Sequence, residues 1–82
     1  MLKIYGSDLC PDCVKCKEDL EQAGVPFEYL PITENLLYMK EFLKLRESRE
    51  EFVPVQEKGQ IGIPCILEEN DKLSLDWEIY MK

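Results

Sequence analysis

Three of the four cysteines of this chain lie close together, in the stretch CPDCVKC at residues 10 to 16. Cys10, Cys13 and Cys16 are spaced three residues apart, and the fourth cysteine is Cys65. Closely spaced thiols serve as a redox couple, as metal ligands or as small apolar side chains in a core. Where thiols are kept reduced, as in the cytosol, such a cluster favours catalysis or metal binding over a structural disulfide.

The spacing of Cys10 and Cys13 suits redox chemistry. We expect Cys10 at or just before the first residue of a helix, where free N–H groups and the helix dipole stabilise a thiolate. Cys13 follows within the first turn, so its sulfur can reach that of Cys10, and Pro11 fixes the turn between them. In such a pair the outer sulfur attacks a disulfide and the inner sulfur resolves the mixed intermediate. Asp12 opposes the thiolate, and two lysines farther along the helix are expected to offset it in part.

The elements around these residues predict one α/β domain over residues 1–82, with the order βαβαββα. Gly24 is expected to end the first helix, and Thr33 and Asp76 are expected to cap the second and third helices. Strands are expected at residues 2–5, 26–31, 63–67 and 72–75, and helices at 11–23, from 33 to beyond 45, and at 77–82.

The predicted sheet is small, four-stranded and mixed, with helices on both faces. We expect right-handed crossovers between the first three strands and an antiparallel last strand at the edge. Residues 46–51 are interpreted as a solvated helix end and 56–62 as a loop. The predicted core residues of the second strand and second helix are Phe27, Tyr29, Leu36, Leu37, Phe42, Leu43 and Leu45.

Two motifs resemble a known family. The stretch IYGSDLCPDC at residues 4–13 resembles the opening of a glutaredoxin, where a strand runs into a Cys-Pro-x-Cys site. Ile63-Pro64 stands where thioredoxin-fold proteins carry a proline after a cis peptide bond, opposite the active-site cysteines. The resemblance covers nearly the whole chain by element order and length. It implies a thioredoxin-like fold and a thiol–disulfide oxidoreductase, in which Cys10 is the nucleophile and Cys13 the resolving thiol.

The resemblance also implies a substrate groove at Ile63-Pro64. Pro64, with Pro11 of the CPDC motif, would contribute to substrate binding in this groove, and the backbone of Ile63 would pair with an extended peptide or with glutathione. The cis form costs an X–Pro bond only about 0.5–1 kcal/mol. We therefore predict a cis Ile63–Pro64 bond, with the Pro64 ring within van der Waals reach of the Cys10 or Cys13 sulfur.

Departures from the glutaredoxin pattern bear on the substrate. No basic residue stands at positions 7–9, just before the cysteines. After the hairpin, the glycine pair that holds glutathione is absent, and Ser74 and Asp76 are the candidate replacements. An acidic protein without those groups is expected to hold the two carboxylates of glutathione poorly. We predict no cofactor, a protein or low-molecular-weight disulfide as the substrate, and glutathione as a disfavoured candidate for the reductant.

The alternative is a binding module without turnover. Cys10, Cys13, Cys16 and Cys65 are candidate thiolate ligands for zinc, copper(I) or an iron–sulfur cluster. The chain has no histidine to complete such a site, and three cysteines on one helical run do not converge without distorting it. For Cys16 alone, the plainer interpretation is a small apolar side chain in the core.

Charge and composition narrow the class of partner. The formal net charge of −7 at pH 7 disfavours nucleic acid and anionic membranes, because both are polyanions. The first five residues lead into a strand pattern without a signal-peptide region, so a cytoplasmic location is expected. We also expect a monomer.

Overall fold

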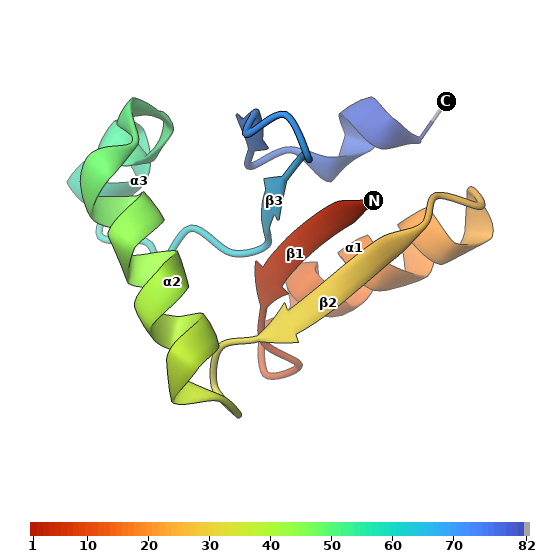
Figure 1. The fold of residues 1–82 in the computed structure, drawn as a ribbon, viewed down its shortest axis with the longest axis horizontal. Coiled ribbons are helices and arrows are strands. Elements are labelled where there is room, and N and C mark those ends of the chain that lie inside the picture. The colour runs from red at the N-terminus through yellow and green to blue at the C-terminus, as the bar shows by residue number, and fades with distance from the viewer. Residues whose placement is uncertain (82) are drawn as a thin grey trace.

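The computed structural model describes residues 1–81. It has a four-stranded mixed sheet with the strand order β2-β1-β3-β4 (Figure 1). The α/β prediction of a small mixed sheet is therefore confirmed. The strands are β1 (Leu2–Gly6), β2 (Phe27–Pro31), β3 (Cys65–Leu67) and β4 (Leu73–Ser74); the helices are α1 (Pro11–Gln22), α2 (Leu36–Ser48) and α3 (Val53–Glu57); and two 3₁₀ turns are η1 (Glu50–Phe52) and η2 (Trp77–Tyr80).

Strand directions agree with the prediction at two of the three pairings. β1 and β2 run parallel, with Ile4 opposite Tyr29 (Figure 1), and β4 pairs antiparallel with β3 at the edge. β3, however, runs antiparallel to β1, with Tyr5 opposite Cys65. The expectation of right-handed crossovers between the first three strands is therefore wrong for the connection that leads into β3. After α2 the chain passes through η1, α3 and a loop, and β3 begins at Cys65 beside the C-terminal end of β1.

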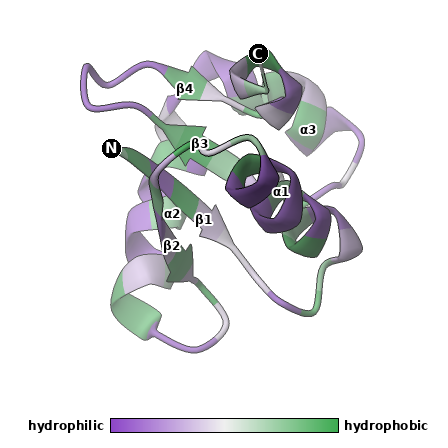
Figure 2. Ribbon diagram, turned by 90° about the vertical axis from the view of Figure 1, so that its right-hand side faces the viewer, coloured by the Kyte–Doolittle hydropathy of each residue, from purple (hydrophilic) through white to green (hydrophobic). Residues whose placement is uncertain are grey.

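The core forms two clusters on opposite faces of the sheet. Neighbouring strand residues point to opposite faces. Accordingly Tyr5 and Cys65 join the cluster that contains Phe42 of α2 and Phe52. The second cluster, on the face that α1 covers, contains Ile4, Cys16, Leu20 and Ile66. Figure 2 shows the strands between α1 on one side and α2 on the other, so helices cover both faces as predicted.

Local sequence signals account for the limits of α1. Pro11 occupies the first helical turn, where its missing N–H is tolerated, and Cys10 is the N-cap residue. The helix ends before Gly24, which has φ of +73°, a conformation that favours glycine.

The predicted start of α2 is wrong by two residues. Asn35, not Thr33, is the N-cap, and its side chain accepts a hydrogen bond of 2.9 Å from the Leu37 N–H. Thr33 Oγ1 instead lies 2.9 Å from the Ser7 hydroxyl, which ties the loop before α2 to the loop after β1.

Three further expectations about elements and core are corrected. Residues 50–57 form η1 and α3, where the sequence predicted a fading helix end and a loop. The last element is the 3₁₀ turn η2, capped by Asp76 as predicted. Leu36, Leu37 and Leu43 are exposed and not core, because α2 buries only Phe42 completely. No helix within residues 1–81 is long and apolar enough to cross a membrane.

Candidate active site

Cys10 and Cys13 lie where β1 leads into α1. The Cys10 N–H donates to the Ser7 carbonyl at 3.0 Å, which closes the loop after β1. The Cys10 carbonyl accepts from the N–H of Cys13 at 3.0 Å and of Val14 at 3.2 Å, so both cysteines belong to the first helical turn. Both thiols are free; Cys10 is partly exposed, whereas Cys13 is completely buried. One sulfur thus faces solvent while the other lies behind it.

The environment of Cys13 keeps its sulfur protonated. Burial, with a smaller contribution from the neighbouring Cys10 side chain, raises the pKa of Cys13 to about 12. A backbone hydrogen bond from Ser7 acts in the opposite direction. Cys13 therefore needs help to become a nucleophile at neutral pH.

Cys10 opens onto a groove of about 510 Å³. The Ile63–Pro64 peptide bond is cis, and both of its residues line this groove. The β1–β3 pairing begins only at Cys65, so the backbone groups of Ile63 lie just beyond the paired part of the sheet. Further lining residues are Asp12, Val55, Gly59, Gln60, Ile61, Gly62, Leu75 and Trp77.

Arg46 holds one wall of the groove in place. Its Nε donates to the Ile61 carbonyl at 2.8 Å and its Nη2 to the Gln60 carbonyl at 2.7 Å. The prediction that residues 46–51 form a solvated helix end is therefore wrong for Arg46. The contact crosses from α2 to a loop many positions later, so no local pattern indicated it.

Gly62 continues this wall. Its φ is +98°, and a Cβ at this position would lie 2.7 Å from the Phe52 ring. Only glycine therefore lets the loop both turn here and rest against Phe52.

Ser74 and Asp76 were predicted to bind substrate, but their side chains are used within their own turn. The Ser74 hydroxyl donates to the Asp76 carbonyl at 3.0 Å and accepts from the Asp76 N–H at 3.1 Å. The Asp76 carboxylate accepts from the Glu78 N–H at 3.0 Å and so begins η2. The neighbouring side chains Leu75 and Trp77 reach the groove instead.

The groove has little positive charge. Among residues 1–81, Asp12 is the one charged residue that lines it. The two lysines of α1 expected to offset Asp12 are paired elsewhere: Lys17 Nζ lies 2.7 Å from the Asp8 carboxylate, and Lys15 Nζ lies 3.4 Å from Asp19. An anionic substrate would therefore meet the Asp12 carboxylate beside Cys10, and neither of these two lysines lines the groove.

The remaining two cysteines lie in different core clusters. Cys16 is buried on the α1 face of the sheet and Cys65 on the α2 face. Burial raises the pKa of each to about 12, which disfavours the thiolate that a metal requires. Within residues 1–81, no three Cys, His, Asp or Glu side chains are grouped so as to hold a metal ion. The arrangement therefore does not support the thiolate-cluster alternative.

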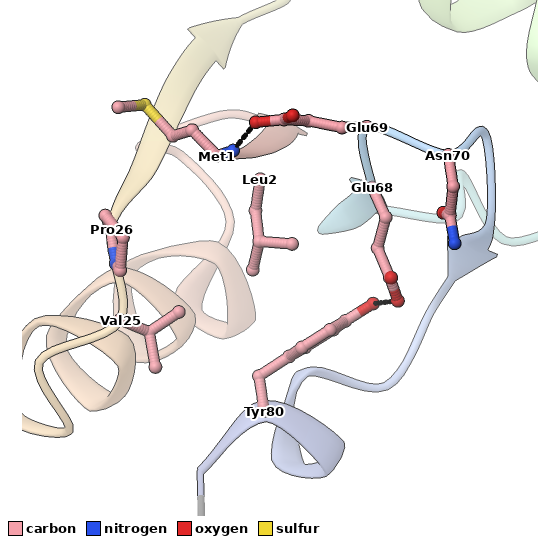
Figure 3. Close-up of a pocket in the computed structure, with 8 residues that line it drawn as sticks. All are labelled: Met1, Leu2, Val25, Pro26, Glu68, Glu69, Asn70 and Tyr80. Carbon is pink, nitrogen blue, oxygen red and sulfur yellow. Dashed lines mark hydrogen bonds and ion pairs between the residues drawn. The ribbon is translucent and has the colours of Figure 1, made fainter.

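A second pocket, of about 520 Å³, opens at the opposite end of β1 (Figure 3). Two contacts shape it: the amino group of Met1 pairs with Glu69, and the Tyr80 hydroxyl donates to Glu68 at 2.7 Å. No cysteine lines this pocket. The groove at Pro64, by contrast, is lined by Cys10.

Comparisons with known proteins identify the family of this chain. A protein 32% identical over 73 residues, covering 89% of this chain and 85% of the other, is an uncharacterized protein of Haemophilus influenzae. No solved structure gives a significant match. The sequence profile of the glutaredoxin family matches residues 2–67, which include both cysteines of the CPDC motif and Pro64. The chain belongs to the glutaredoxin family.

Proposed function

We propose that this protein is a thiol–disulfide oxidoreductase that cycles between a Cys10/Cys13 dithiol and a Cys10–Cys13 disulfide. The observation that carries the proposal is the pairing of a partly exposed Cys10 at a helix N-cap with a buried Cys13 one turn later. Family membership supports thiol chemistry of this general kind.

The reaction proceeds in two exchanges. The Cys10 thiolate attacks one sulfur of the substrate disulfide, and the other substrate sulfur leaves as a thiolate and takes up a proton. Cys13 then loses its proton and attacks Cys10 Sγ, so that a Cys10–Cys13 bond forms and the second substrate thiol is released. The substrate disulfide gains two electrons, and the protein dithiol loses them.

The groove favours an extended protein or small disulfide of neutral or positive charge over glutathione. Its lining is largely apolar, and Asp12 supplies its charge. Glutathione carries two carboxylates, so binding brings like charges together. A monomer acting in the cytoplasm, where a reducing system returns the disulfide to the dithiol, fits this role.

Substitution of each cysteine tests the proposal. Cys10→Ser should abolish reduction of a model peptide disulfide, because no attacking sulfur remains at the groove. Cys13→Ser should accumulate a mixed disulfide with one substrate half, detected as added mass on the intact protein. Cys16→Ser serves as the matched control, since Cys16 lies away from the groove, and it should retain activity. Full activity in both Cys10→Ser and Cys13→Ser would refute the assignment.

Charge selectivity is tested separately. Asp12→Asn should raise the rate with glutathione disulfide several-fold and leave the rate with a neutral peptide disulfide unchanged. An equal change for both substrates would show that Asp12 does not select by charge.

A further inference from the structure

Tyr29 on β2 carries a buried hydroxyl without a partner. Its Oη is completely shielded from solvent and, within the described residues, makes no hydrogen bond. Buried polar groups in native proteins are nearly always paired, because an unpaired buried hydroxyl is unfavourable. The proposed catalytic cycle offers this hydroxyl an acceptor that the resting protein lacks.

The Tyr29 hydroxyl and the Cys13 sulfur lie beside the same residue, Gly6. A Cβ on Gly6 would lie 2.9 Å from Tyr29 Oη and 3.0 Å from Cys13 Sγ. The two atoms therefore flank one small space over the end of β1, and the absence of a side chain on Gly6 leaves that space open.

Other groups around Tyr29 are already engaged. Lys17 Nζ lies 4.1 Å from the centre of the Tyr29 ring and 2.7 Å from the Asp8 carboxylate. Asp8 is thus held by Lys17; its carboxylate lies close enough to Tyr29 to raise the pKa of that hydroxyl, but no hydrogen bond of normal geometry joins the two in the described part of the chain. Burial, followed by the charges of Cys13 and Asp8, raises the pKa of Tyr29, so the hydroxyl keeps its proton and acts as a donor.

We propose that Tyr29 is a positioning residue for the second exchange: its hydroxyl donates a hydrogen bond to Cys13 Sγ as this sulfur attacks Cys10. This inference rests on the proposed dithiol cycle. The Cys13–Cys10 bond forms, the bond between Cys10 and the substrate sulfur breaks, and its electron pair leaves on the substrate sulfur. That sulfur takes up a proton equivalent to the one Cys13 lost, and Tyr29 keeps its own proton throughout.

The hydrogen bond is stronger to a thiolate than to a thiol, because the acceptor is charged. The hydroxyl therefore stabilises the attacking form of Cys13 more than its resting form, which is the condition for accelerating a step. It also offsets part of the burial that keeps Cys13 protonated.

Tyr29→Phe tests the role, because it removes Oη and keeps the ring beneath Lys17. The reduced protein is mixed with a smaller amount of 4,4′-dithiodipyridine, an uncharged disulfide whose thiopyridone product absorbs light. Attack by Cys10 releases one product at a rate that depends on concentration, and resolution by Cys13 releases the second in a first-order phase. Tyr29→Phe should leave the first phase unchanged, slow the second about tenfold, and shift its pH profile upward.

The same variant should not be less stable. Removal of an unpaired buried hydroxyl should leave Tm unchanged or raise it by about a few degrees, so slow resolution would not come from damaged packing. Tyr80→Phe, which removes a paired hydroxyl at the far pocket, is the matched control and should leave both phases unchanged.

The outcomes separate the two proposals. A wild-type rate and pH profile for the second phase in Tyr29→Phe would overturn the role of Tyr29 and leave the dithiol cycle intact. Equal slowing of both phases would also overturn it, because the effect would then not be specific to Cys13. If the wild type itself shows no second phase that depends on Cys13, the dithiol cycle is wrong, and the role of Tyr29 falls with it.

Discussion

Gly6 sets how closely β1 can approach the buried thiol. It is the last residue of β1 and is itself buried, and a Cβ added to it would lie about 3 Å from Tyr29 Oη and from Cys13 Sγ. Such distances are shorter than ordinary van der Waals contact, so even one methyl group would displace both neighbours.

Gly6→Ala should therefore destabilise the protein by about 1–3 kcal/mol, the usual effect of overfilling a packed site. Urea unfolding of the reduced protein measures this loss. The double variant Gly6→Ala/Tyr29→Phe should recover part of it, because the nearest clashing atom is gone. Simple addition of the two single effects would show that the methyl group clashes elsewhere.

At the scale of elements, α2 shapes the groove through one side chain. Arg46, near the end of α2, donates to two consecutive carbonyls of the loop before Gly62. Arg49, three residues later, binds the Asp71 carbonyl at 3.0 Å and so fastens the turn between β3 and β4 instead. The two arginines thus provide a matched pair for experiment.

Arg46→Met keeps the apolar stem and removes both donors. We expect faster hydrogen exchange at residues 60–62 and a loss of about tenfold in kcat/KM for a peptide disulfide, because the wall that receives the peptide becomes mobile. Alkylation of Cys10 by iodoacetamide should keep its rate, since Arg46 does not touch the thiols. Arg49→Met should leave both exchange at 60–62 and kcat/KM unchanged; equal losses in the two variants would indicate general destabilisation.

The elements that local signals define were predictable from the sequence. Pro11 and Gly24 bound α1, and the alternating patterns at residues 2–5 and 26–31 indicated β1 and β2 close to where they lie. The placement of Cys10 at the start of α1 followed from these signals, and it was the basis of the predicted site.

The elements that distant contacts define were not predictable in the same way. Phe52 is completely buried against Phe42, and this packing stabilises a 3₁₀ turn and α3 in a stretch whose local sequence reads as loop. The direction of β3 depends on its pairing with β1. Arg46 supports the groove by binding carbonyls 14 and 15 positions later in the chain. The role proposed for Tyr29 depends on the position of its hydroxyl beside Gly6, which lies on another strand.

At the scale of the whole molecule, the buried cysteines make the free energy of unfolding depend on pH in the alkaline range. Cys13, Cys16 and Cys65 are completely buried, and burial raises the pKa of each from about 9 to about 12. Above pH 9 the unfolded chain loses these protons while the folded protein keeps them. The unfolded state is then favoured, so stability is intact below about pH 9 and falls as the pH rises toward 12.

Each such thiol should contribute about 1.4 kcal/mol per pH unit to this loss. Cys16→Val keeps an apolar side chain in the α1 cluster and removes one titrating group. Between pH 8 and pH 10, reduced Cys16→Val should lose about 1.4 kcal/mol less unfolding free energy than the wild type. Identical losses in urea unfolding at the two pH values would show that Cys16 ionises equally in both states.

Trp77 is the only tryptophan of the chain, and it lines the groove that Cys10 opens onto. Its indole N–H donates to Asp19 at 3.0 Å, which holds the ring at the junction of η2 and α1. Emission excited at the red edge of protein absorption therefore originates at the site itself. Because a disulfide quenches an excited indole nearby, formation of the proposed Cys10–Cys13 disulfide should lower the fluorescence of Trp77, so that oxidation can be followed without an attached dye.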